Sequence, residues 1–516
     1  MSKALIKKPE WVVLTDHQKN WKNKDISSLF EDNPNRFKDF SVTLKGLTFD
    51  YSKQPVTSKT IALLSDLAES SYLNQYKQKL FNGDIVNPTE NRAAWHTELR
   101  NPNTQYENIG EQLHRMRFVS ERIRSQEWKG CTGKSIRNIV HIGIGGSYLG
   151  PRMVCHALKK YSHPDLSIFY LSNIDGDAIA NILKKCDPET TLFIVASKTF
   201  STQETIENAK SCKRWLESNL RKHNCFKKHF IALTSNKEAA KAFGISEENI
   251  LLFWNWVNGR FSLWSTIGLP ISISIGHDHF EKLLEGAHTI DHHFLSSSPK
   301  ENIPILMAML SIWNRNFFDR KVESVISYSE SLSYFPSYLQ QLIMESGGKS
   351  SDLQNNIISD YQTSSIVLGA IGTNAQHSFF QLLHQGTDII PCDLIGFIHA
   401  DHHYSQHHKI LLNNMIAQGQ ALMQGRSSQN SHKAFGGSRP VNTILLDRLD
   451  AYHLGMLIAL YEHKTFVQSV IWNINCFDQF GVELGKSIAT DFQNDDLTKS
   501  DPSTKALYSL IHKSGK

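Results

Sequence analysis

The chain has 516 residues, more than one hydrophobic core usually organises, so we expect two or three domains. Its residues are 40% hydrophobic and 20% charged, which is ordinary for a globular protein, and a formal net charge of +5 is too dilute over this length to indicate a nucleic-acid partner. The N-terminal segment lacks the apolar core of a signal peptide, and the longest apolar runs, such as 305–312, are shorter than a membrane span. We therefore expect a cytoplasmic protein with no membrane partner.

The seven cysteines include no CxxC pair. An odd number without paired spacing favours reduced, scattered thiols over a disulfide framework or a zinc site. His403 and His407 have the spacing that puts two imidazoles on one helical face. With 24 histidines in the chain such pairs arise by chance, and two ligands do not make a metal site, so we expect no bound metal.

Residues 1 to about 130 mix polar and apolar positions at helical spacing, which predicts a mostly helical leading region with strand-like patches only near 40–51. Within it, Pro88 and Thr89 precede a run that continues to Arg100 and has the composition of a helix. Proline and threonine are typical of a helix start, so a helix is predicted there, with its charges on a solvated face.

From Ser135 apolar runs alternate with helical segments, which predicts a parallel α/β sheet. The expected strands lie in the segments IRNIVHIGIGG, LSIFYLSN, TLFIVA, KHFIALTSN and NILLFWNWV. The glycine-rich turn at 143–147 follows the first strand, but Tyr148 stands where a dinucleotide loop needs its third glycine. The first strand also has no acidic residue where a ribose ligand is expected, so the sequence argues against NAD.

The segment 191–205, TLFIVASKTFSTQET, joins a buried strand to a hydroxyl-rich turn and a helix. Ser197 comes at the carboxyl end of the strand, where open α/β sheets bind ligands. Taken alone, the turn is either a phosphate site or a plain Ser/Thr helix cap. Because Ser147 ends a neighbouring strand and would converge on the same place, the sequence favours a small bound anion such as phosphate.

A second strand and helix pattern begins near residue 300, with a helix at 305–317, a strand at 322–327, a helix from Pro336 and a strand at 365–369. In the Pro336 helix, Gln341 and Glu345 lie four residues apart and share one face. Glu345 is then either a surface carboxylate or a base held over a ligand. His377 follows the strand at 365–369 in the first turn of a helix predicted to end at Gly386, where a satisfied polar role is more common than catalysis.

Seven motifs, in this order along the chain, resemble the glucose-6-phosphate isomerase family. They are GIGGSYLGP (143–151), SKTFSTQET (197–205), NGRFSLWSTIGLP (258–270), YLQQLIMESGGK (338–349), GTNAQHSFFQLLHQGT (372–387), LGMLIALYEH (454–463) and FDQFGVELGK (477–486). With NPTENRAAWHTELR in the leading region they span residues 87 to 486, and the last motif alone is highly specific.

The resemblance implies an α/β fold of two parallel-sheet sugar-isomerase domains, each a three-layer αβα sandwich, with helical extensions at both ends. The expected division is a helical region at 1–130, a first domain at 131–290, a second at 300–486 and a tail at 487–516. It also implies a homodimer that isomerises glucose 6-phosphate to fructose 6-phosphate without a cofactor.

The same resemblance implies how a sugar phosphate is held. The phosphate would contact Ser147, Ser197, Thr199 and Thr202, with Lys198 contributing mainly through its backbone. Further substrate contacts would come from Gly259, Gln341 and Gln479.

Four residues are implied in the chemistry. Glu345 would move a proton between C1 and C2, and Arg260 would stabilise the enediolate oxygen that develops. Lys486 and His377 would serve ring opening, with His377 of the partner subunit reaching into the site.

The chain departs from the usual family pattern at several positions, although every implied catalytic side chain is present. Asn258 replaces a glycine before Arg260, and Asn255 an aspartate, which puts the backbone near Arg260 in question. Ala375 and the loop 368–371 differ near His377. The remaining departures are Tyr148, Gly347 and Cys476.

Two rival interpretations stay open. A phosphosugar-binding regulator could keep the same phosphate loops, although it would have no use for Glu345, Arg260 and Lys486 together. An isomerase that also accepts mannose 6-phosphate would differ only in pocket shape, which the sequence does not show.

Overall fold

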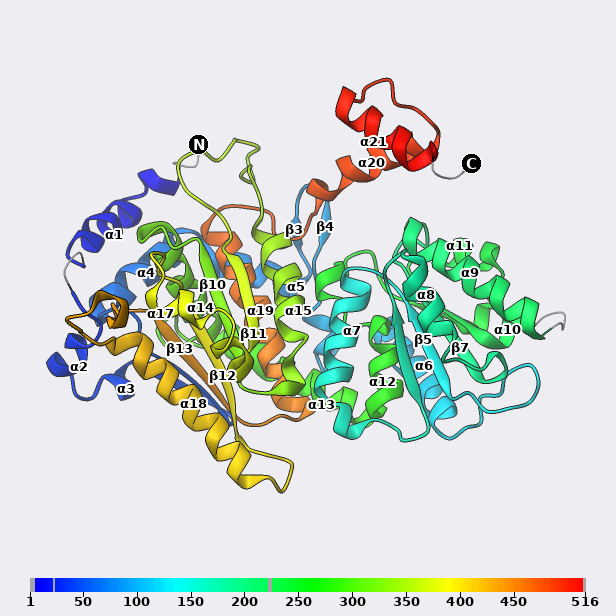
Figure 1. Ribbon diagram of the computed structural model, residues 1–516, viewed down its shortest axis with the longest axis horizontal. Helices are drawn as coiled ribbons and strands as arrows, with labels where there is room; N and C mark the ends of the chain where they lie inside the picture. Colours follow the sequence, from blue (N-terminus) through cyan, green and yellow to red (C-terminus); the bar gives the residue numbers. More distant parts are fainter. Residues whose placement is uncertain (1–4, 22–23, 221–224, 514–516) are drawn as a thin grey trace. The chain divides into compact units, whose positions relative to one another are not determined.

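The computed structural model of the chain describes residues 5–21, 24–220 and 225–513 (Figure 1). The chain divides into two compact units, Met1–Cys476 and Phe477–Lys516. The first unit contains a five-stranded sheet, a six-stranded sheet and a two-stranded ribbon. The expected domain boundaries near residues 130, 290 and 486 stay a prediction.

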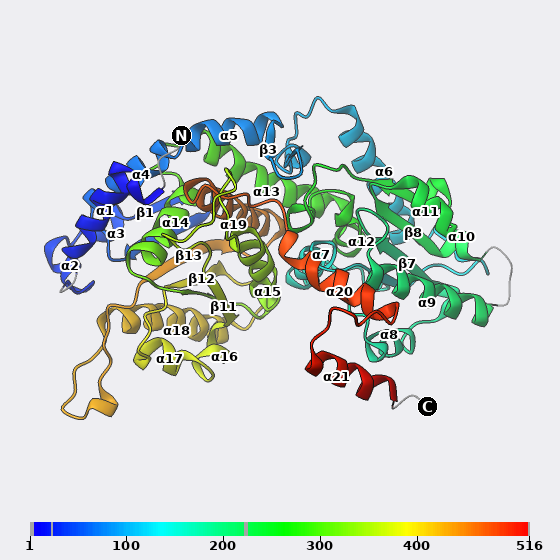
Figure 2. The ribbon, with the colours of Figure 1, turned by 90° about the horizontal axis from the view of Figure 1, so that it is seen from above.

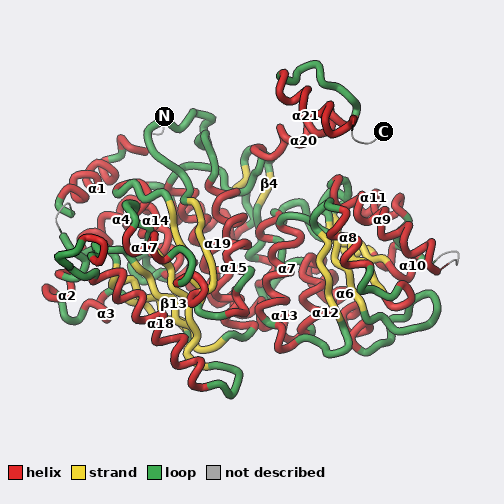
Figure 3. The backbone as a smooth tube through the Cα atoms, in the orientation of Figure 1, coloured by secondary structure: helices red, strands yellow, loops and turns green. Residues whose placement is uncertain are grey.

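The five-stranded sheet has the order β6-β5-β7-β8-β9, and all of its neighbouring strands are parallel. It forms where the sequence predicts it, because the strands are short apolar runs: the inner strands β5, β7 and β8 are buried between helices, and the edge strand β6 is only partly buried (Figure 3). The strands are β5 (Asn138–Ile142), β6 (Ser167–Leu171), β7 (Thr191–Ala196), β8 (Phe230–Thr234) and β9 (Ile250–Leu252). Their helices are α7 (Gly146–Ala157), α8 (Gly176–Leu183), α9 (Gln203–Leu220), α10 (Phe226–His229) and α11 (Lys237–Phe243).

The six-stranded sheet has the order β1-β2-β13-β12-β10-β11. Four strands are parallel, as the family resemblance implies: β10 (Val322–Ser327), β11 (Ile366–Ile371), β12 (Cys392–His399) and β13 (Val441–Arg448). The first two form where strands are predicted at 322–327 and 365–369, and β12 and β13 are additional. The leading region adds an antiparallel hairpin of β1 (Ser41–Leu44) and β2 (Leu47–Lys53), which makes this sheet mixed. Lys45 and Gly46 both have positive φ, the geometry of a two-residue hairpin turn.

Helices cover both faces of the six-stranded sheet. In Figure 2, α17 and α18 lie on one side of its strands, and α14 and α19 on the other. These helices are α14 (Ile303–Ile312), α16 (Gly372–Gln376), α17 (Phe380–Gln385), α18 (Ser405–Gln424) and α19 (Ala451–Ile471). The helix predicted over 372–386 is therefore interrupted at His377–Phe379, because the chain turns there before Phe380 and Leu383 enter the core.

Helix α19 is buried along almost its whole length and packs on α13 (His277–Ser296). Glycines allow the two helices to approach closely: a Cβ on Gly286 would lie 1.8 Å from the Tyr452 carbonyl oxygen, and one on Gly455 would lie 2.0 Å from that of Leu283. Any side chain at either position would push the helices apart.

The other helices of the first unit are short or belong to the leading region. They are α1 (Pro9–Lys19), α2 (Ser28–Asp32), α3 (Arg36–Asp39), α4 (Ser58–Ser70), α5 (Leu73–Asn82), α6 (Glu107–Arg124), α12 (Leu269–Ile275) and α15 (Phe335–Leu339). The second unit consists of α20 (Glu483–Gln493) and α21 (Pro502–Lys513), preceded by the 3₁₀ turn η12 (Phe480–Val482). Among the residues described, no helix is long and apolar enough to cross a membrane.

Two further helix predictions differ from the structure. The helix from Pro336 is α-helical only to Leu339 and continues as the π-helical segment η10 (Gln340–Glu345), a geometry that is frequent at functional sites. The helix predicted after Pro88 is absent. The chain forms the ribbon β3 (Ile85–Asn87) and β4 (Arg92–Ala93) and then the 3₁₀ turn η2 (Glu98–Arg100), whose Arg100 side chain is buried.

The expectation of reduced thiols is wrong for one pair, because Cys131 and Cys225 form a disulfide with Cα atoms 5.1 Å apart. Cys131 lies in the turn before β5, and Cys225 lies directly before α10 and β8. Both strands belong to one parallel sheet, so the segments that lead into them meet at the same edge although 94 residues separate the cysteines. The other five cysteines are free thiols.

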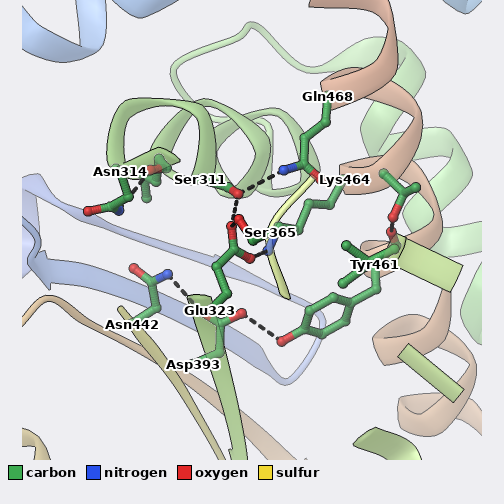
Figure 4. A network of polar contacts seen from close by, with 12 residues as sticks. Ser311, Asn314, Glu323, Ser365, Asp393, Asn442, Tyr461, Lys464 and Gln468 are labelled. Carbon is green, nitrogen blue, oxygen red and sulfur yellow. Dashed lines mark hydrogen bonds and ion pairs between the residues drawn. The ribbon is translucent and has the colours of Figure 1, made fainter. Parts of the chain in front are cut away.

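A buried polar network joins the six-stranded sheet to α14 and α19 (Figure 4). Glu323 of β10 pairs with Lys464 of α19 at 2.7 Å and accepts a hydrogen bond from the Ser365 hydroxyl at 3.0 Å. Burial alone would raise the pKa of Glu323, but the Lys464 ammonium holds it below its usual value. On the same helix, the Tyr461 hydroxyl donates to Asp393 of β12 at 2.8 Å. Buried charges in this layer are thus paired and hydrogen-bonded.

Candidate active site

The hydroxyl-rich turn at 197–202 connects β7 to α9 and is held in one conformation. The Ser197 and Thr202 hydroxyl oxygens lie 3.1 Å apart, and Ser201 donates to the Thr199 hydroxyl at 2.7 Å. Between them Phe200 has a φ of +55° while its side chain is buried in the core. A left-handed phenylalanine costs free energy, and such strain is concentrated at functional sites. The turn therefore presents its hydroxyls at the carboxyl end of the sheet.

The Lys198 side chain is used inside the protein. Its ammonium donates to the carbonyl oxygens of Asn255 at 2.6 Å and Val257 at 3.0 Å, which joins the turn to the loop before Arg260. Burial lowers the pKa of Lys198 to about 8, and Arg92 acts in the same direction. Asn255 contributes here through its backbone, so the absence of the family's usual aspartate leaves this contact intact.

A hydrogen bond from a buried histidine holds the second predicted anion loop, at the start of α7. His141 of β5 is fully buried, and its Nε2 lies 2.7 Å from the carbonyl oxygen of Ser147. Burial lowers the pKa of His141 to about 4, so the ring is neutral and donates this hydrogen bond. Gly145 precedes the helix with a φ of +58°, a conformation that suits glycine.

Arg260 and Glu345 form the charged pair of the site. Arg260 lies in the 3₁₀ turn η6 (Gly259–Phe261), and its Nη1 lies 3.7 Å from Oε2 of Glu345 at the end of η10. The guanidinium is buried, donates through Nε to Ser346 at 2.7 Å and also donates to the Cys476 carbonyl oxygen, whereas 23% of the Glu345 side chain is exposed. A fixed cation therefore faces a carboxylate that remains accessible to a ligand.

Gln341 connects this pair to the Ser147 turn. It lies in the same π-helical segment as Glu345, and its amide nitrogen would be 3.1 Å from a Cβ on Gly145. Its Oε1 is buried and makes no hydrogen bond to the described residues. Of the sequence-predicted site residues, the structure thus brings Ser147, Gly259, Arg260, Gln341 and Glu345 into one neighbourhood.

Three further predicted site residues are His377, Gln479 and Lys486. His377 follows α16 and is exposed. Gln479 and Lys486 lie in the second unit, where the Lys486 ammonium is 3.3 Å from the Glu483 carboxylate and both side chains are exposed. Their roles stay predictions.

Two residues that hydrogen-bond to the site loops are not singled out by the sequence. His141 lies within a predicted strand. Tyr338 lies within a predicted helix, and its hydroxyl is 3.5 Å from the Arg260 carbonyl oxygen. The available signal was a polar side chain inside an otherwise apolar run, as at His141 in NIVHI and Glu462 in LIALYEH. In the part of the chain that the structure describes, no group of three His, Cys, Asp or Glu could hold a metal ion.

Hydroxyl-bearing loops at the carboxyl ends of parallel strands, beside a buried arginine and an accessible carboxylate, are the features expected of an α/β protein that binds a small anion. The model of the phosphoglucose isomerase family matches residues 50–508. The chain is 45% identical to the glucose-6-phosphate isomerase of Chlorobium phaeobacteroides over an alignment of 533 residues, which covers 97% of this chain and 95% of that protein. It is 47% identical over 503 residues to glucose-6-phosphate isomerase 1 of Chromohalobacter salexigens, covering 94% and 91%.

A solved structure agrees with these relatives. The crystal structure of a glucose-6-phosphate isomerase from Chlamydia trachomatis superposes with a TM-score of 0.88 at 32% identity, covering 99% of both chains. The chain therefore belongs to the phosphoglucose isomerase family.

Proposed function

We propose that this protein interconverts glucose 6-phosphate and fructose 6-phosphate, a step of glycolysis and gluconeogenesis. The observation that carries the proposal is the Arg260–Glu345 pair at 3.7 Å, next to the Ser147 turn, in a chain of the phosphoglucose isomerase family. Curated relatives with 43–47% identity over nearly the whole chain are glucose-6-phosphate isomerases.

The substrate phosphate binds to the two hydroxyl loops. Ser147, Ser197, Thr199 and Thr202 donate to its oxygens, and backbone N–H groups at the starts of α7 and α9 add to the positive potential there. Lys198 contributes mainly through its backbone, which agrees with an ammonium already bonded to two carbonyl oxygens.

Isomerisation moves a proton between C1 and C2 of the open-chain sugar. Glu345 removes the proton from C2 of the aldose and returns it to C1, and Arg260 stabilises the negative charge on the enediolate oxygen. Because the guanidinium is buried and held by Ser346 and the Cys476 carbonyl, it needs no reorganisation when that charge develops. The proton transfer only rearranges the sugar internally, so its balance requires no external oxidant or reductant.

Ring opening precedes this step. His377 and Lys486 transfer protons at the ring oxygen and the anomeric hydroxyl, and Gly259, Gln341 and Gln479 contact the sugar. The exposed position of His377 supports a homodimer in which His377 of the partner subunit completes the site. The family's metabolic role supports a cytoplasmic location.

The function is tested by measuring turnover of glucose 6-phosphate, fructose 6-phosphate and mannose 6-phosphate by the purified protein without added metal. Conversion of the first two into each other is expected. A protein that binds these sugar phosphates, as measured by calorimetry, but converts none of them would be a phosphosugar-binding regulator. Conversion of mannose 6-phosphate as well would broaden the substrate range and leave the proposed chemistry in place.

A further inference from the structure

A second carboxylate, Glu462, lies buried beside the loop that carries Arg260. It belongs to α19, and its carboxylate accepts two strong hydrogen bonds: Oε2 from Arg100 at 2.6 Å and Oε1 from the Trp264 indole at 2.8 Å. The Arg100 guanidinium also lies over the Trp264 ring, 4.7 Å from its centroid. Burial raises the pKa of Glu462 to about 7, although Arg100 opposes this shift.

Arg100 is itself fixed by a second acid. Its Nε and Nη2 donate to the two oxygens of Asp291 on α13, both at 2.6 Å. His463 approaches Asp291 at 2.6 Å from the same side. The Arg100 guanidinium therefore bridges Asp291 of α13 and Glu462 of α19 through charge-assisted hydrogen bonds.

Glu462 reaches both elements that carry the reacting side chains. Trp264 comes four residues after Arg260 on the same loop. The Tyr338 hydroxyl lies 3.5 Å from Glu462 Oε1 and 3.5 Å from the Arg260 carbonyl oxygen, and Tyr338 precedes Glu345 by two turns of the same helical segment. Oε1 of Glu462 is thus within hydrogen-bond distance of both Trp264 on the Arg260 loop and Tyr338 on the helical segment that ends at Glu345.

We propose that Glu462 is a positioning residue for the isomerisation: by holding Trp264 and Tyr338 against Arg100, it sets the separation of Arg260 from Glu345. This proposal rests on the proposed function of that pair. The phosphate loops at Ser147 and Ser197 follow strands of the five-stranded sheet, and no hydrogen bond between them and Glu462 is described. Loss of the Glu462 contacts therefore acts first on the separation of Arg260 from Glu345, and it lowers the rate of the chemical step more than it weakens phosphate binding.

The substitution Glu462→Gln is the decisive one because of hydrogen-bond direction. The carboxylate accepts from both Arg100 and Trp264, whereas an amide has one accepting oxygen and presents N–H groups on its other side. Whichever way the amide turns, one donor meets another donor and the loop or the arginine must shift. A displacement of about 1 Å between reacting groups is enough to lower a rate about 10²-fold.

Tyr461→Phe is the matched control. Tyr461 is the adjacent residue on α19, is equally buried and donates a hydrogen bond to a carboxylate, but that carboxylate is Asp393 of β12 (Figure 4). It costs a buried hydrogen bond without touching Trp264, Tyr338 or Arg260. Trp264→Phe is the second test variant, because it keeps both members of the Arg100–Glu462 pair and removes the indole N–H that bonds Glu462 to the Arg260 loop.

The measurements are kcat and KM for glucose 6-phosphate, the isotope effect with substrate deuterated at C2, and the midpoint of urea unfolding. For Glu462→Gln and Trp264→Phe we expect kcat to fall at least tenfold with KM within threefold of wild type, and the isotope effect to rise because proton transfer limits turnover more. Tyr461→Phe should lower the unfolding midpoint and keep kcat within twofold.

Three outcomes overturn the proposal: kcat within twofold of wild type in the Glu462 variant, an equal loss of kcat in Tyr461→Phe, or a KM that rises while kcat holds. If Glu462→Gln does not fold, Trp264→Phe decides alone. A wild-type protein that does not isomerise its substrate would instead refute the proposed function, which separates the two failures.

Discussion

Gly146 and Gly259 meet backbone to backbone, so the first turn of α7 and the loop of Arg260 are fitted to each other without any side chain between them. A Cβ on Gly146 would lie 2.0 Å from the carbonyl carbon of Gly259 and 2.6 Å from the backbone nitrogen of Arg260. The Ser262 hydroxyl closes the same contact by donating to the Gly146 carbonyl oxygen at 3.4 Å. This junction couples the Ser147 loop, which binds phosphate in our proposal, to the cation that serves the chemistry.

Gly146→Ala should therefore misplace Ser147 and Arg260 together. The contact is with backbone atoms, which cannot swing aside, so the two loops must separate by an ångström or more. We expect kcat/KM to fall about 10²-fold or further, measured with glucose 6-phosphate. Gly176→Ala, at the start of α8 where a Cβ meets nothing within 4 Å, is the control and should keep wild-type activity. Normal kinetics in Gly146→Ala would show that the junction does not matter.

Thr202→Ala should weaken substrate binding by roughly 1–3 kcal/mol, the range for leaving a charged partner short of one hydrogen bond. Its hydroxyl lies 3.1 Å from that of Ser197, so the two converge on one ligand group. The measurement is the dissociation constant of glucose 6-phosphate by calorimetry, compared with Ser218→Ala, an exposed hydroxyl near the other end of α9. If the dissociation constant of glucose 6-phosphate is unchanged in Thr202→Ala, this hydroxyl does not bind the phosphate.

The disulfide predicts five free thiols in the unfolded, unreduced protein, against seven after reduction. Because it closes a loop of 94 residues, its loss should lower the free energy of unfolding by roughly 2–4 kcal/mol. The check is thiol titration followed by urea unfolding with and without reductant. Cys131→Ser should reproduce the effect of reductant and then be insensitive to it, whereas Cys186→Ser should leave the difference intact. Seven reactive thiols without reductant would show that the pair is open in solution.

The sequence specified the five-stranded sheet strand by strand because its signals are local. The inner strands, such as TLFIVA, are apolar runs that burial on both faces explains, and β6 and β8 lead to helices whose N-caps are Asp175 and Asn236. The positions of the hydroxyl loops were predictable for the same reason, since Ser197 comes directly after β7, Ser147 lies at the start of the helix that follows β5, and parallel strands end at one edge.

The features that were missed depend on contacts between distant segments. No local pattern distinguishes the α-helical from the π-helical half of 335–345, since both halves have helical composition. Arg100 and Glu462 are 362 residues apart, and only the packing of α13 on α19 brings them together. The family motifs nevertheless contained both residues, in NPTENRAAWHTELR and LGMLIALYEH, without indicating what they contact.

His141 predicts how stability depends on acid. Burial lowers its folded pKa from 6.5 to about 4, so the unfolded chain binds the proton more tightly and stability is complete above pH 6.5 and is lost as pH falls towards 4. At 1.36 kcal/mol per pKa unit, the loss attributable to His141 is about 3 kcal/mol. His141→Gln should have a shallower fall in unfolding free energy between pH 6.5 and 4, measured by urea unfolding, while His402→Gln at an exposed position should follow the wild type. If the unfolding free energies of His141→Gln and the wild type fall in parallel between pH 6.5 and 4, the His141 ring is not a neutral buried group.

Glu345→Gln tests the base itself. The amide has nearly the same shape and keeps a contact with Arg260 through its oxygen, so fold and phosphate affinity should survive, but it can neither remove the C2 proton nor return one to C1. Isomerisation should fall by at least roughly 10²- to 10⁴-fold, as expected for loss of general-base catalysis. A matched control is Glu330→Gln in the turn η9 (Glu330–Leu332), which precedes the same helical segment and should leave kcat unchanged.

Measurements in heavy water distinguish proton transfer by Glu345 from ring opening. The wild type should incorporate solvent deuterium at C2 of glucose 6-phosphate or C1 of fructose 6-phosphate, because the proton held by a carboxylate exchanges with solvent before it is returned. Glu345→Gln should still accelerate interconversion of the anomers, which we assign to His377 and Lys486, and should incorporate almost no deuterium, both followed by NMR. If the variant exchanges the C2 hydrogen at near the wild-type rate, another group is the base, and the 3.7 Å pairing of Glu345 with Arg260 then has only a structural meaning.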